Sequence, residues 1–209
     1  MPAAVSTTAG STTPETPVSR PIKLVRVAVL LLSGIAIAFS ATLHEQLSFD
    51  LGMAALTIGA VGIAHLVEWW SLRSRGGNPL PLLLGVVSLA AALGLALTDT
   101  VIVFAVVVAG WALLSALLEF VGMTVRPGSR QDAVFLGATG MLLALLVILV
   151  RTDEVAVLGF LGAYAVLAGV YLGISAFDTR RASAPGDGAI SDGAASERSP
   201  LSSPPESRR

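Results

Sequence analysis

Six long apolar runs, separated by short polar connections, make up most of the chain. They cover residues 22–43, 49–70, 80–97, 101–123, 133–150 and 155–177. About 20 apolar residues in a helix cross a bilayer core about 30 Å thick, so each run predicts one transmembrane helix. The third run is short and is expected to stand upright or to thin the bilayer locally. Because Ala and Leu dominate runs that lack the alternation of a membrane barrel, the pattern predicts an all-α six-transmembrane-helix bundle.

Polar segments flank this apolar body. Residues 1–20 are rich in Ser, Thr, Pro and Ala, and residues 179–209 are rich in Ser, Pro, Gly and acidic side chains. Neither segment has enough bulky apolar side chains to offset the entropy lost on ordering. We therefore expect two disordered cytoplasmic tails on either side of a transmembrane domain that covers residues 21–178.

The basic residues lie at every second connection, and this fixes the expected orientation. The first group consists of Arg20, Lys23, Arg26, Arg73, Arg75, Arg126, Arg130, Arg180 and Arg181. The opposite connections carry Glu45, Asp50, Asp99, Asp153 and Glu154, with Arg151 as their one base. Cytoplasmic loops of membrane proteins carry an excess of Lys and Arg. The alternation predicts a multi-pass protein of the cell's inner or plasma membrane with both termini in the cytoplasm.

The first run also resembles a secretory signal peptide. It has a basic start, an apolar stretch and small residues at Ala36 and Ala38. However, the apolar stretch continues to Leu43, and a long polar segment precedes the basic residues. We therefore expect the first helix to be retained in the mature protein.

The composition excludes several classes of chemistry. Only 13% of the residues are charged, whereas a soluble domain carries about a quarter. The chain has no cysteine, which excludes disulfides, thiolate metal sites and a cysteine nucleophile. It also lacks a Gly-x-Ser-x-Gly motif, a phosphate-binding glycine loop and a His-Glu-x-x-His motif. We expect no enzyme activity, no cofactor or metal and no nucleic-acid partner, and the lipid bilayer is the expected partner.

The even-numbered runs resemble one another. With an offset of 51 residues, Gly59, Ala64 and Glu68 of the second run align with Gly110, Ser115 and Glu119 of the fourth. With a further offset of 53, Ala168 of the sixth run aligns with Ser115, and Leu172 stands where the glutamates were. The repeat predicts three tandem helical hairpins, each of which enters the membrane from the cytoplasm and returns to it.

Small residues on these helices are candidates for close helix packing. Lipid tails are as apolar as leucine, so helices associate through close contacts that small side chains permit. The candidate packing positions are Gly59, Ala64, Gly110, Ser115, Gly169 and Gly173. A seam of this kind can pack within one bundle or face a second subunit, so a homo-oligomer stays open.

Three polar side chains within the apolar runs are candidate functional residues. Glu68 and Glu119 lie in the last turns of the second and fourth runs, close to Arg73 and Arg126. Each carboxylate can pair with a nearby arginine at the headgroup level, or it can form a proton or ion site. His65 precedes Glu68 by one turn, and the two can relay a proton because histidine titrates near neutrality. His65 can equally be a packed core residue.

The repeated segments carry a resemblance to a known family. Residues 109–119 (Ala-Gly-Trp-Ala-Leu-Leu-Ser-Ala-Leu-Leu-Glu) look like the core of the short hairpin repeat of the HdeD family. Residues 58–68 and 161–170 resemble its other copies, and the resemblance covers roughly residues 22–177. His65 departs from the pattern, which usually has a small residue there, and Ala116 replaces a common glycine.

The resemblance implies a small bacterial inner-membrane protein of six helices that is associated with acid resistance. The family has no established catalytic residues to carry over to this chain. The first functional hypothesis is therefore a non-enzymatic HdeD-like protein in acid or envelope stress. The alternative is a small transporter or proton-coupled permease that uses His65, Glu68 and Glu119.

The orientation can be tested with reporter fusions along the chain. Fusions after Arg73 and Arg126 should report the cytoplasm, and fusions after Asp99 and Asp153 should report the outside, because arginines favour the inner side. A reporter after Arg73 or Arg126 that is active outside the cell would contradict the predicted topology.

Overall fold

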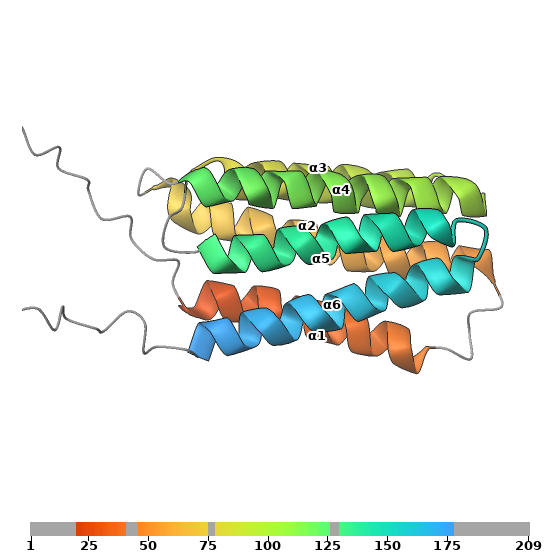
Figure 1. Cartoon of the computed structure of the whole chain (residues 1–209), viewed down its shortest axis with the longest axis horizontal. Helices are drawn as coiled ribbons and strands as arrows, with labels where there is room; N and C mark the ends of the chain where they lie inside the picture. Colours follow the sequence, from red (N-terminus) through yellow and green to blue (C-terminus); the bar gives the residue numbers. More distant parts are fainter. Residues whose placement is uncertain (1–19, 41–45, 75–77, 126–129, 178–209) are drawn as a thin grey trace, which may run out of the picture. The chain divides into compact units, whose positions relative to one another are not determined.

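The computed structural model describes residues 20–40, 46–74, 78–125 and 130–177. All regular structure in these ranges is helical (Figure 1). The helices are α1 (Arg20–Phe39), α2 (Leu47–Arg73), α3 (Leu80–Ala96), α4 (Val101–Val125), α5 (Arg130–Leu149) and α6 (Glu154–Phe177). The predicted tails lie outside the described residues, apart from Arg20, at which α1 begins.

The helix bounds follow the apolar runs closely, with one larger difference at the end of α1. The run predicts a helix to residue 43, but α1 ends at Phe39 and residues 41–43 lie outside the described ranges. Ser40 closes the last turn, because its amide donates to the carbonyl of Ala36 and its hydroxyl donates to that of Ile37. At the other helices the bounds differ from the predicted ones by at most three positions. The largest extensions are at the end of α2 and at the start of α5, where Asp132 lies in the first turn.

Five helices are long and apolar enough to cross a membrane, namely α1, α2, α4, α5 and α6. The remaining helix, α3, has 17 residues and is about 25 Å long. It lies along α4, since a Cβ on Gly122 would be 3.5 Å from Leu80 and a Cβ on Gly94 would be 3.8 Å from Val107. The architecture is that of a multi-pass helical membrane protein.

The most extensive packing joins each even helix to one odd helix, which is the next helix in the chain for α2 and α4 and the first helix of the bundle for α6. These pairs are α2 with α3, α4 with α5, and α6 with α1, so the last helix packs on the first (Figure 1). The neighbours α1 and α2, α3 and α4, and α5 and α6 contact one another less extensively. The grouping into three tandem hairpins stays a prediction. The main packing pairs group the helices differently, because each predicted hairpin partner is replaced by the helix on its other side in the chain, with α6 paired to α1.

The three main pairs share one kind of close contact. A Cβ on Gly34 would lie 3.0 Å from the carbonyl oxygen of Gly162. A Cβ on Gly85 would lie 3.1 Å from that of Gly62, and a Cβ on Gly140 would lie 3.3 Å from that of Ala112. In each case the helix backbones approach closely because the odd helix has a glycine. The three carbonyls belong to residues 62, 112 and 162, which follow one another at intervals of 50 residues.

The two ends of the bundle differ in chemistry. We call the end where α1 begins at Arg20, α2 ends at Arg73 and α5 begins at Arg130 the arginine-bearing end. Most of the large, fully buried side chains lie in the opposite half. We call the following residues the apolar plug: Ile58, Leu95, Phe104, Val108, Val147, Val157, Leu158 and Leu161.

The contact between α1 and α6 can be tested with a matched pair of alanine substitutions. Gly34→Ala should destabilise the bundle by about 1–3 kcal/mol, because its Cβ would meet Val166 at 2.6 Å and the α6 backbone at 3.0 Å. Gly159→Ala, on an open face of α6, should change stability by no more than about 1 kcal/mol. Equilibrium unfolding in mixed detergent micelles measures both, and equal stability of the two variants would contradict the close contact.

Candidate functional site

Charged side chains from four helices gather at the arginine-bearing end of the bundle. They are Lys23 and Arg26 of α1, Glu68 of α2, Glu119 of α4 and Asp132 of α5, and together with His65 we call them the charged cluster. The first five line a cavity of about 70 Å³. Leu80, Gly122, Ala133, Leu136 and Leu172 complete its wall, so all six helices contribute.

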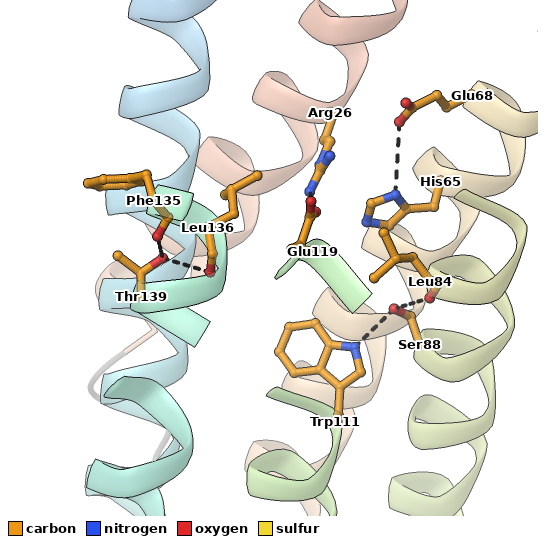
Figure 2. Close-up of polar contacts among 10 residues, drawn as sticks. All are labelled: Arg26, His65, Glu68, Leu84, Ser88, Trp111, Glu119, Phe135, Leu136 and Thr139. Carbon is orange, nitrogen blue, oxygen red and sulfur yellow. Dashed lines mark hydrogen bonds and ion pairs between the residues drawn. The ribbon is translucent and has the colours of Figure 1, made fainter. Parts of the chain in front are cut away.

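Arg26 and Glu119 form the shortest ion pair of the cluster. The Nη2 atom of Arg26 donates a hydrogen bond of 2.9 Å to Oε1 of Glu119, and both side chains are largely buried (Figure 2). The two residues are 93 positions apart in the chain. A charge-assisted bond is strong in surroundings of low dielectric constant, so this pair fastens α1 to α4.

Asp132 connects three helices. Its Oδ2 lies 3.6 Å from the ammonium of Lys23 on α1, and the hydroxyl of Ser175 on α6 donates to both carboxylate oxygens at 2.9 Å. Lys23 is the more exposed partner. This group holds α1, α5 and α6 together close to the helix ends.

Glu68 and His65 lie deeper in the cluster. Nδ1 of His65 is 3.9 Å from Oε2 of Glu68, one turn away on α2, and both residues are buried (Figure 2). Glu68 also interacts electrostatically with Arg26. The three polar residues singled out in the sequence, His65, Glu68 and Glu119, therefore belong to one cluster.

The arginine that pairs with Glu119 is not the one expected from the sequence. The guanidinium of Arg73 lies 3.7 Å from the ring centroid of Trp70 and 5.7 Å from that of Trp69, and Arg126 lies outside the described residues. Arg26 looks like a flanking charge before the first helix, but it lies on the second turn of α1. Its presence at the edge of an apolar run is the signal that could have identified it.

Three further acids lie inside the described helices, and one of them, Glu154, is the first residue of α6. Asp132 is in the first turn of α5 and belongs to the cluster. Asp50 is in the first turn of α2 at the opposite end and is fully buried. Glu68 and Glu119 are therefore not the only carboxylates within the helices.

The predicted packing positions differ in their surroundings. Gly169 is at a tight contact with Leu30 and Leu31, Gly173 faces Val27, and Gly59 faces Ala92. Ala64 is buried. Gly110 and Ser115 do not show such a contact. A Cβ on Gly110 would have no atom within 4 Å, so Gly110 makes no close helix contact. The Oγ atom of Ser115 is buried without a hydrogen-bond partner among the described residues.

A buried hydrogen-bond chain separates the charged cluster from the apolar plug. The indole of Trp111 donates to Oγ of Ser88 at 2.9 Å, and Ser88 donates to the carbonyl of Leu84 at 2.8 Å (Figure 2). The ring of Trp111 packs edge-on against Tyr164, with centroids 6.0 Å apart. The indole N–H of Trp111 and the hydroxyl of Ser88 are therefore satisfied within the protein.

The described residues contain no group of three or more His, Asp or Glu side chains arranged to hold a metal ion. Comparison of the chain with models of protein families, with curated proteins and with solved structures finds no match.

Removal of one partner of the central ion pair should weaken the bundle. Glu119→Gln leaves Arg26 largely buried without its counter-charge, so we expect a loss of about 1–3 kcal/mol, between the values for exposed and fully buried pairs. Arg26→Gln together with Glu119→Gln should cost less than the sum of the two single changes.

Equilibrium unfolding of the two single variants and the double variant measures this coupling. Asp99→Asn, at an exposed position between α3 and α4, serves as the charge-matched control and should leave stability unchanged. Strictly additive effects of the two cluster substitutions would show that Arg26 and Glu119 do not stabilise each other.

Proposed function

We propose that this chain is a non-enzymatic, HdeD-like protein of the inner membrane that acts in acid or envelope stress. It crosses the membrane six times, with both termini in the cytoplasm. The family assignment rests on the resemblance of residues 58–68, 109–119 and 161–170 to the HdeD hairpin repeat. The role in acid or envelope stress is what that resemblance implies.

The extent of α3 supports six crossings. Its first residue, Leu80, lies near Gly122 in the last turns of α4, and Gly94 lies near Val107 in the second turn of α4. A helix that runs beside a membrane-spanning neighbour over this length covers most of the same depth. With α3 as a crossing, every basic connection falls on one side of the membrane.

The apolar plug is the observation that favours a structural role over transport. A transported ion needs polar groups along its whole route, because a charge in an apolar interior is costly. The charged cluster occupies the arginine-bearing end, whereas Phe104, Leu158 and Leu161 in the opposite half are fully buried and apolar. We therefore assign the cluster a structural role, in which its ion pairs hold α1 against α4 and α5.

A transporter is the second candidate, because the cavity brings together the residues that proton transfer would use. Glu68 and Glu119 line it, and His65 is 3.9 Å from Glu68. A proton route through this site would also need to pass the plug. Transport would thus require a rearrangement of the opposite half of the bundle.

The stress role predicts a survival phenotype. Deletion of the gene should lower survival of the host cell at acidic external pH and leave growth at neutral pH unchanged. Complementation with the unaltered chain should restore survival. Survival equal to that of the parent strain across the whole pH range would remove the stress proposal.

The same proposal can be set against transport by proton-flux measurements in reconstituted vesicles. Vesicles with the protein should take up protons no faster than empty vesicles, and the Glu68→Gln, Glu119→Gln double variant should behave in the same way. A proton flux that the unaltered chain produces and the double variant lacks would establish the transporter instead.

A further inference from the structure

The cavity at the arginine-bearing end contains a polar atom that the protein leaves unsatisfied. The Nε–H of Arg26 is buried and has no hydrogen-bond acceptor among the described residues, although Nη2 of the same guanidinium bonds to Glu119. A buried donor without an acceptor costs about 1–3 kcal/mol, so an acceptor is expected beside it. Water is the smallest molecule that can supply one.

The cavity has room for water and offers it partners. Its volume of about 70 Å³ exceeds the roughly 10–15 Å³ that a cavity needs to hold one water molecule. A stable buried water needs two to four polar partners. The lining carboxylates of Glu68, Glu119 and Asp132 are acceptors, and Arg26 and Lys23 are donors.

Lys23, close to a helix end, is the most exposed side chain of the charged cluster, and His65, the farthest from a helix end, is the least exposed. The side chain of Lys23 is 33% exposed, those of Arg26 and Glu119 are 18% and 15% exposed, and those of Glu68 and His65 only 9% and 4%. Lys23 is three residues from the start of α1, whereas His65 is eight residues, or about 12 Å, from the end of α2. The cluster is therefore more exposed at Lys23, near the helix ends, than at the level of His65.

We propose that the cavity is a hydrated vestibule, entered from the arginine-bearing end, which brings water to Arg26, Glu119 and Glu68 and stops at the Trp111–Ser88 hydrogen bond. Beyond that bond lies the apolar plug, which excludes water. The buried carboxylates thus exchange with the aqueous phase on one side of the membrane only. This inference does not depend on the stress role or on the family resemblance.

Cysteine accessibility tests the vestibule, since the native chain has no cysteine. Two matched pairs of single-cysteine variants compare the cavity wall with the plug level. Ala133→Cys in the wall is paired with Ala105→Cys, and Leu136→Cys in the wall is paired with Leu158→Cys; all four native side chains are buried. The full-length chain is reconstituted in vesicles, and the probe is aminoethyl methanethiosulfonate.

The thiolate is the reactive species, and it forms only where water stabilises its charge. We expect the two cavity cysteines to react at least on the order of tenfold faster than their partners. Burial in apolar surroundings raises the pKa of a thiol, and each unit of that rise lowers the thiolate fraction about tenfold. Free cysteine placed as a scavenger on the side of Arg73 should suppress the cavity reaction, and scavenger on the other side should not.

Each other outcome overturns the proposal. Equal, slow reaction in both members of each pair would mean that the cavity is dry or closed. Equal, fast reaction would mean that water passes the plug. Suppression by scavenger on the side opposite Arg73 would place the entrance at the wrong end. Thermal unfolding of all four variants shows whether each retains the fold, and the alanine pair involves the smaller change of volume.

Discussion

The fold depends on close backbone approach within three helix pairs, which are α2 with α3, α4 with α5, and α6 with α1. In lipid, burial of apolar surface does not draw helices together, so contact at short range must do so. The glycines at positions 34, 85 and 140 let an odd helix approach a carbonyl of its partner. At such distances Cα–H groups and carbonyl oxygens of facing helices make weak favourable contacts. Three equivalent contacts hold the three main helix pairs.

This packing divides the bundle into two chemically distinct halves. In the half away from the arginines, large apolar side chains fill most of the interior, and Asp50 is a buried carboxylate among them. In the other half, carboxylates and basic groups from different helices meet around a cavity. A charge held within a membrane needs a partner, and these partners come from distant parts of the chain. The ion pairs therefore specify which helices become neighbours at that end.

Helix positions could be predicted from the sequence, but helix partners could not. Apolar runs report where a helix meets lipid, and their bounds agree with the structure to within a few residues at most ends. The partner of Glu119 is 93 residues away, and no local pattern indicates it. The sequence repeat likewise aligned Gly59 with Gly110, whereas the contacts use residues 62 and 112. The interval of 50 residues between the contacts thus differs by one to three residues from the offsets of 51 and 53 in the predicted repeat.

The pairing of α6 with α1 has a consequence for how the protein is made. The chain emerges from the ribosome from its N-terminus, so α1 is synthesised first and its main packing partner last. Until then, the close contact between Gly34 and α6 cannot form. Arg26 must also wait for Glu119, which arrives with the fourth helix. Assembly of the bundle therefore cannot be completed during translation of its first half, and the earliest helix receives its main packing partner only when the last helix is made.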